Sequence, residues 1–187
     1  LGQWVLDAAC HQLALWAQQQ ATATWTLAIN VGPSQFAGEG FVTQIATALR
    51  NAGANPQRLI LELTESMLMT DNEETRTRMH AIKALGVEFS LDDFGTGYSS
   101  LQHLQRLPLD QLKIDRSFVH QLLTNLGDAT VARSVVALGH SLGLTVIAEG
   151  VETAEQRNML AELGCDAFQG YFFGRPAPAV ELEHLDK

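Results

Sequence analysis

The stretch 87-VEFSLDDF-94 is a short apolar run that ends in two adjacent carboxylates, Asp92 and Asp93. Five other runs along the chain share this design, an apolar segment with a polar residue near its end that could hold a metal or touch a phosphate. They are 25-WTLAINV-31, 59-LILELTES-66, 111-QLKIDR-116, 145-TVIAEGV-151 and 167-AFQGYFF-173. Since a buried charge must be paired or coordinated, the repetition suggests that these polar residues converge on one site.

Segments with helical periodicity separate the six runs. They cover residues 2–20, 34–52, 72–85, 98–106, 128–142 and 153–163. Alternating strands and helices predict a parallel sheet with helices outside it. An open doubly wound sheet binds at one switch point between strands, whereas a TIM-type (β/α)8 barrel gathers every strand end around one mouth. Because all six runs end in candidate residues, we predict an α/β fold of the barrel type, with about six of the eight strands present in this chain.

Composition and charge narrow the classes of function. A net charge of −9 argues against a long nucleic acid as partner, and the histidines form no HxH or HExxH motif that would predict zinc. Cys10 and Cys165 form no CxxC pair, so we expect buried or semi-buried free thiols and a cytoplasmic protein, which other segments could still tether to a membrane. The chain lacks an initiator Met and the basic region of a signal peptide, so we expect it to be part of a longer protein.

The candidate metal ligands are all oxygen donors. Asp92 and Asp93 repel each other unless a cation lies beside them. Within a strand they would point to opposite faces, but at the turn that ends the strand both could reach one metal cluster. Glu62, Glu149 and Asn30 stand at equivalent places in other runs. Such a set favours Mg²⁺ or Mn²⁺, and the alternative is a solvated acid pair in a turn.

Lys113 alternates with Leu112 and Ile114, so it points into the barrel if these two pack against the helices. There it would form a structural salt bridge, or it would steady an attacking water or a phosphate oxygen.

Glu65 is a candidate anchor for the glycine-containing loop 92–100, or else an acid in the first turn of the next helix. Two metals on shared carboxylates and a lysine, without a nucleophilic Cys or Ser–His pair, predict hydrolysis of a phosphate ester.

Five stretches resemble the signature blocks of the EAL-domain family of cyclic di-GMP phosphodiesterases. They are 62-ELTES-66, 92-DDFGTGYSSL-101, 113-KIDRSF-118, 148-AEGVET-153 and 169-QGYFFGRP-176, and their order matches along essentially the whole chain. The resemblance implies a TIM-type barrel that uses Mg²⁺ or Mn²⁺, with two ions, to hydrolyse one phosphodiester of cyclic di-GMP to linear pGpG. It also implies a homodimer through the region of loop 92–100, and upstream sensory or diguanylate-cyclase-like domains.

The resemblance implies a role for each matching residue. The positions that match metal ligands are Asn30, Glu62, Asp92 and Asp93. Glu149 matches a second-metal ligand or the general base, and Lys113 matches the lysine that contacts the hydrolytic water. Glu65 matches the glutamate that holds loop 92–100, and Gln169 matches a residue near the substrate and the metals. The two supporting positions are Asp115 and Glu152.

The Glu-Ala-Leu tripeptide that names the family is absent. One metal-ligating glutamate and a nearby arginine that meets the phosphate are absent with it. The chain is then either a piece of an intact enzyme or a degenerate domain. Because the other family positions are retained, we expect residues 1–187 to be an EAL phosphodiesterase domain that is incomplete at its N-terminus and inactive at this length. The competing functions are a non-catalytic cyclic di-GMP receptor and a regulatory interaction module.

Overall fold

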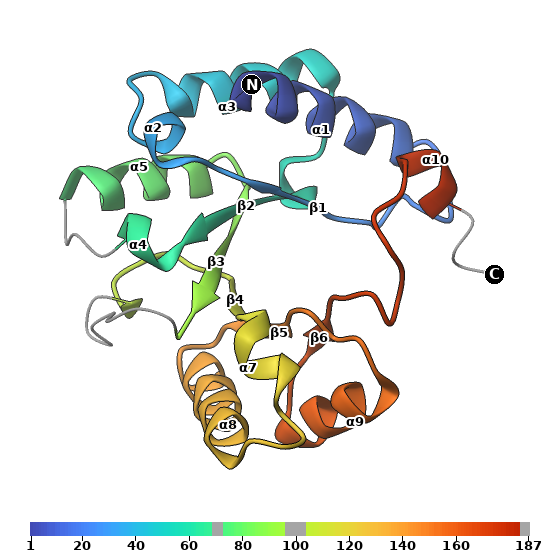
Figure 1. The fold of residues 1–187 in the computed structure, drawn as a ribbon. Coiled ribbons are helices and arrows are strands. Elements are labelled where there is room, and N and C mark those ends of the chain that lie inside the picture. Colours follow the sequence, from blue (N-terminus) through green and yellow to red (C-terminus); the bar gives the residue numbers. More distant parts are fainter. Residues whose placement is uncertain (69–72, 96–103, 184–187) are drawn as a thin grey trace. The chain divides into compact units, whose positions relative to one another are not determined.

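The computed structural model describes residues 1–68, 73–95 and 104–183 (Figure 1). The chain divides into two compact units. The first unit consists of Leu1–Leu63, Asp71–Phe89 and Pro176–Lys187, and the second consists of Thr64–Thr70 and Ser90–Arg175. The chain passes from one unit to the other after Leu63, Thr70, Phe89 and Arg175.

The first unit pairs two parallel strands and covers them with helices. Its elements are α1 (Gly2–Trp16), β1 (Leu27–Asn30), α2 (Pro33–Phe36), α3 (Phe41–Ala52), a 3₁₀ turn (Pro56–Arg58), β2 (Leu59–Thr64), α5 (Glu73–Lys83) and α10 (Ala179–Leu182). Helices α1 and α3 lie side by side and bury Leu6, Leu13 and Ile45 (Figure 1). Strand β2 is buried along Leu59–Leu63, as a parallel strand covered on both faces should be.

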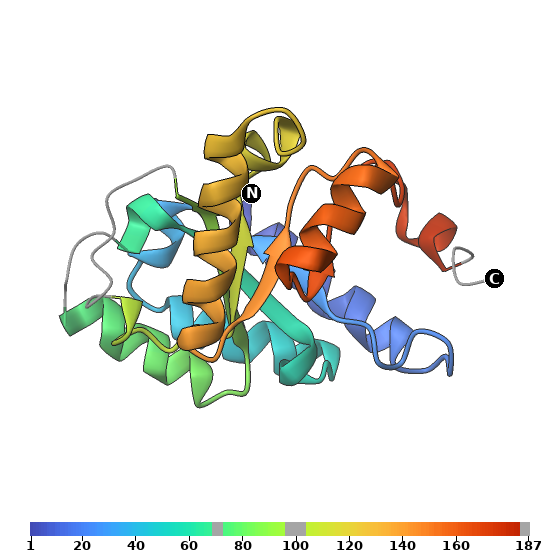
Figure 2. The same cartoon turned by 90° about the horizontal axis from the view of Figure 1, so that it is seen from below.

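The second unit repeats the strand–helix alternation. Its elements are α4 (Glu65–Leu68), β3 (Glu88–Phe94, which begins in the first unit), β4 (Gln111–Ile114), α7 (Arg116–His120), α8 (Leu126–Ser141), β5 (Thr145–Ala148), α9 (Ala154–Leu163) and β6 (Ala167–Phe168). Strand β4 lies between β3 and β5, and β6 pairs with β5, all in parallel. Helix α8 packs against β4, β5 and α9 (Figure 2).

Local sequence signals set several helix ends. Thr153 caps α9 in a reciprocal capping box with Gln156, and Gly164 ends this helix at a φ of 99°. Gly143, at a φ of 74°, lies just after α8, where the predicted helical segment 128–142 also ends. The predicted helix 34–52 is wrong as a single element, because the chain turns at Gly40, whose φ is 85°, and separates α2 from α3.

Of two other helix predictions, one is wrong about where the helix ends, and the other lies mostly outside the described residues. The predicted helix 2–20 ends at Trp16, whose carbonyl accepts a hydrogen bond from the Thr22 hydroxyl at 2.9 Å instead of continuing the helical ladder. Most of the predicted helix 98–106 lies outside the described residues.

The described residues contain six strands, and the strand pairings described above within each unit are parallel. The prediction of an α/β fold with about six strands is therefore confirmed. Cys10 and Cys165 are buried free thiols, also as predicted. In the part of the chain that the structure describes, no helix combines the length and the apolar content needed to cross a bilayer.

Candidate active site

The first unit places two predicted oxygen ligands beside each other. Asn30 ends β1 and stands opposite Glu62 in the parallel pairing with β2. The amide of Val31 donates to the Glu62 carbonyl at 3.0 Å, which carries the pairing one residue past the end of β1. Glu62 is buried whereas Asn30 is exposed. The ends of two adjacent strands therefore offer an amide and a carboxylate at the same level of this sheet.

The second unit brings three predicted carboxylates together. Asp92, Asp93 and Glu149 each offer an oxygen, and these oxygens all lie within 4.8 Å of one another. Asp92 and Asp93 belong to β3, and Glu149 directly follows β5. Strand β4 separates β3 from β5, so the cluster spans three neighbouring strands. Three carboxylates at this spacing repel one another and form an oxygen-rich cradle for a hard divalent cation.

The geometry that lets Asp92 and Asp93 share this cluster differs from the prediction. The strand does not end at the aspartates but continues to Phe94. Asp93 adopts a φ of 56°, and the pairing of β3 with β4 shifts its register between Leu91 and Phe94. This irregularity overrides the alternation that would send the two side chains to opposite faces. A left-handed non-glycine residue costs about 1–3 kcal/mol and is typical of functional sites.

Lys113 contacts two of the three carboxylates. Its side chain is only 3% exposed, its Nζ lies 3.5 Å from Asp92 Oδ1, and it forms an ion pair with Glu149. Leu112 and Ile114, on either side of it in β4, are fully buried. A buried lysine needs such partners, and this one carries a positive charge into the middle of the candidate metal cradle.

Within the cluster, the Asp93 carboxyl group has a raised pKa. Burial, followed by the negative charges of Asp92 and Asp115, raises the pKa of Asp93 above its ordinary value, and Lys113 opposes this shift. Asp115 also caps α7 by accepting a hydrogen bond from the Ser117 amide at 3.0 Å. A side-chain hydrogen bond with Asp115 also raises the pKa of Asp93, so Asp115 acts on the protonation of this carboxyl group from the start of α7.

Glu65 holds the start of the predicted loop 92–100. It is 4% exposed, and its Oε2 accepts a hydrogen bond from the Gly95 amide at 3.3 Å. Gly95 has a φ of 100°, and a Cβ there would lie 3.0 Å from the Phe118 ring. Both facts favour glycine at this point. Residues 96–100 of the loop lie outside the described residues.

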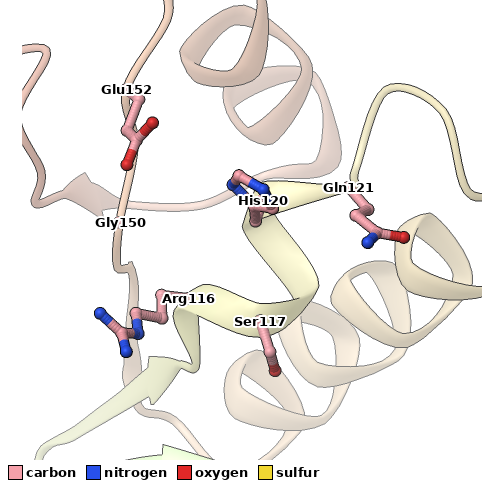
Figure 3. Close-up of a pocket in the computed structure, with 6 residues that line it drawn as sticks. All are labelled: Arg116, Ser117, His120, Gln121, Gly150 and Glu152. Carbon is pink, nitrogen blue, oxygen red and sulfur yellow. The ribbon is translucent and has the colours of Figure 1, made fainter.

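Gln169 and Glu152 border a cavity beside the cluster. This cavity has a volume of about 250 Å³, and its lining residues are Arg116, Glu149, Gly150, Glu152, Gln169, Gly170 and Tyr171. A second cavity of about 440 Å³ adjoins α7 (Figure 3). Sequence reasoning missed Arg116 and Tyr171 as site residues. The position of Arg116, directly after Asp115 at the end of a predicted strand, was the available signal.

Comparison with known proteins gives consistent matches. A family model described as "EAL domain" matches residues 1–176. The bifunctional diguanylate cyclase/cyclic di-GMP phosphodiesterase MucR of Pseudomonas aeruginosa is 46% identical over 182 residues, which cover 97% of this chain and 26% of that protein. The oxygen sensor protein DosP of Escherichia coli is 41% identical, over 97% of this chain and 23% of its own length. The chain therefore spans about a quarter of the length of these relatives.

Solved structures extend the likeness to three dimensions. The PaMucR phosphodiesterase in complex with c-di-GMP matches 97% of this chain and 73% of its own with a TM-score of 0.93 at 46% identity. This match confirms the predicted TIM-type fold. Klebsiella pneumoniae BlrP1, in a complex with manganese and cy-diGMP at pH 6, matches 92% of this chain and 44% of its own with a TM-score of 0.80 at 34% identity.

Proposed function

The chain belongs to the EAL domain family, and we propose that it is the catalytic part of a metal-dependent phosphodiesterase that hydrolyses cyclic di-GMP to linear pGpG. The observation that carries the proposal is the cluster of Asp92, Asp93 and Glu149, with oxygens within 4.8 Å of one another and Lys113 paired to two of its members. The substrate class comes from MucR, a cyclic di-GMP phosphodiesterase whose solved structure is a complex with c-di-GMP.

The donor set fits hard divalent cations. Carboxylate oxygens are the ligands that Mg²⁺ and Mn²⁺ prefer, and the mutual repulsion around Asp93 is relieved when positive charge enters the cluster. We propose Asp92, Asp93 and Glu149 as metal ligands of the second unit, and we propose Asn30 and Glu62, taken by themselves, as metal ligands of the first unit. Two ions, when bound, supply a hydroxide nucleophile and neutralise charge on the phosphoryl oxygens.

The protein groups then have separate tasks. In this proposal Glu149 takes a proton from the attacking water, and its ion pair with Lys113 supports the role because it orients the carboxylate. The Lys113 ammonium, almost fully shielded from solvent, provides positive charge where negative charge develops on the phosphate. Glu65 fixes the backbone at Gly95, two residues after Asp93, and so limits movement of the cluster.

We extend the proposal to the setting of the domain. Residues 1–187 form part of one phosphodiesterase domain that works in the cytoplasm, dimerises through the region of loop 92–100 and is controlled by sensory or diguanylate-cyclase-like domains. The name of MucR, which pairs a diguanylate cyclase with a phosphodiesterase, supports the last point.

The test uses the natural full-length protein, incubated with cyclic di-GMP and Mn²⁺, with pGpG measured by chromatography. Glu149→Ala should abolish the product, whereas Glu162→Ala, an exposed position on α9, should leave turnover unchanged. Tight binding of cyclic di-GMP without product would indicate a receptor instead, and absence of binding would indicate an interaction module.

A further inference from the structure

We propose that Gly150 and Gly170 are positioning residues, whose lack of a side chain lets a bulge after β5 hold the Glu149 carboxylate in the metal cluster. The inference rests on the proposed metal-dependent function, and it adds what fixes one ligand relative to the other two. Every residue involved belongs to the second unit.

The chain that continues β5 carries one extra residue opposite Gln169. The Gln169 amide donates a hydrogen bond to the Ala148 carbonyl at 2.8 Å, and the Gln169 carbonyl accepts one from the Val151 amide at 3.0 Å. In an evenly spaced parallel ladder the second bond would come from residue 150, two positions after Ala148. Gly150, at a φ of 68°, is instead left out of the ladder, as in a β-bulge.

A matching irregularity lies on the other side of β4. Between Leu91 and Phe94, β3 advances three residues while its partner β4 advances two, so β3 also carries one extra residue. Asp93 lies in this stretch and has a positive φ, as Gly150 does. The carboxylates of the cluster therefore come from two bulged segments that flank β4, whose own pairing with β5 is regular.

Two glycines make room for the bulge after β5. A Cβ at Gly150 would lie 2.6 Å from the Cβ of Arg116, at the start of α7 (Figure 3). A Cβ at Gly170 would lie 2.1 Å from the carbonyl oxygen of Val151 and 2.3 Å from its amide nitrogen. Both Val151 groups also form the hydrogen bonds that hold the bulge to the segment after β6. A side chain at position 170 would therefore push the bulge away from that segment.

Glu149 is the functional residue that such a push would move. Its amide donates to the Ile114 carbonyl at 3.1 Å, and it stands between the two residues that bond to Gln169. Its carboxylate lies within 4.8 Å of the oxygens of Asp92 and Asp93, so a small shift changes the ligand spacing. A displacement of about 1 Å at a reacting site costs on the order of a hundredfold in rate. Loss of the groups that support a metal ligand weakens metal binding roughly ten- to hundredfold.

The experiment measures Mn²⁺ binding by the natural full-length protein, using calorimetry without nucleotide, and then kcat and KM for cyclic di-GMP. We expect Gly170→Ala to bind Mn²⁺ roughly tenfold more weakly than wild type. Its kcat at saturating Mn²⁺ should fall on the order of a hundredfold, with a smaller change in KM.

The matched control is Gly139→Ala in α8, where a Cβ would lie 2.4 Å from Cγ2 of Val146 in the same strand, β5. This substitution crowds β5 away from the cluster. It should lower the melting temperature, because overpacking destabilises a core, but it should leave the Mn²⁺ affinity unchanged.

Gly150→Ala provides a second test that does not depend on position 170. It should also weaken Mn²⁺ binding, and adding Arg116→Gly, which removes the Cβ that the new side chain would meet, should restore part of the affinity. Arg116→Gly alone measures the effect of losing the arginine charge, so the three variants and wild type form a double-mutant cycle.

A folded Gly170→Ala protein with wild-type Mn²⁺ affinity would refute the positioning role and leave the proposed function standing. Where that variant does not fold, additive effects of Gly150→Ala and Arg116→Gly would refute the role in the same way. If wild type binds Mn²⁺ but forms no pGpG, the proposed function fails, and the Mn²⁺ affinities of the variants still test the positioning role.

Discussion

Replacing Lys113 with methionine tests the idea that its charge holds the carboxylate cluster together. Methionine fills the space of the aliphatic stem but leaves Asp92 and Glu149 without their buried counter-charge. Removing one partner of a fully buried pair costs about 3–5 kcal/mol. The side chains of Asp92 and Glu149 are 13% and 17% exposed, so solvent relieves part of this penalty. We therefore expect the free energy of unfolding to fall by about 3 kcal/mol, near the lower limit of that range. For a chain of this length that loss lowers the melting temperature by roughly 6–12 °C.

The assay is thermal unfolding of residues 1–187 by calorimetry, without divalent metal and with Mn²⁺, alongside turnover of cyclic di-GMP by the natural full-length protein. Mn²⁺ should reduce the difference in melting temperature between wild type and Lys113→Met, because a bound cation replaces the missing positive charge. Turnover should still fall on the order of 10²- to 10³-fold, as for loss of a preorganised charge at a reacting phosphate. Lys83→Met, at the end of α5, is the control for loss of a lysine outside the cluster. An unchanged melting temperature without metal, or wild-type turnover, would refute the reasoning.

Two further predictions concern the second unit's surface and the thiols. The amide of Val146 and His140 lower the pKa of Asp166, so this carboxylate stabilises the fold above its ordinary pKa of 3.8 and loses that effect as the pH falls through its depressed folded value. Asp166→Asn should therefore unfold more easily than wild type in urea at pH 7 and equally easily in strong acid, and a difference that persists in acid would contradict this. Burial raises the pKa of Cys10 to about 11 and that of Cys165 to about 12, so neither should react with iodoacetamide at pH 8 until urea unfolds the chain. Mass spectrometry of the alkylated native protein checks this, and modification of either thiol before unfolding would show that burial does not protect it.

Much of the architecture follows from patterns short enough to read locally. Apolar runs and helical segments along the chain predicted the alternation of strands and helices, because each βα unit needs only its own periodicity and turn residues. Thr153 and Gly164 fixed the ends of α9 for the same reason. The prediction of one helix over 34–52 was wrong at Gly40. This residue adopts a left-handed conformation that interrupts the helix, and the spacing of apolar residues does not reveal it.

The candidate site shows the same division. Sequence alone determined which oxygen donors follow which strands, and that Lys113 sits between two buried apolar residues, because side-chain direction in a strand alternates with every residue. Tertiary structure decided that Asp92 and Asp93 share one cluster, because the left-handed Asp93 and the shift against β4 arise from pairing between strands distant in the chain. It also decided that Arg116 and Glu152 border one cavity, since residues 36 positions apart meet only after β4 and β5 pair and Gly150 approaches α7.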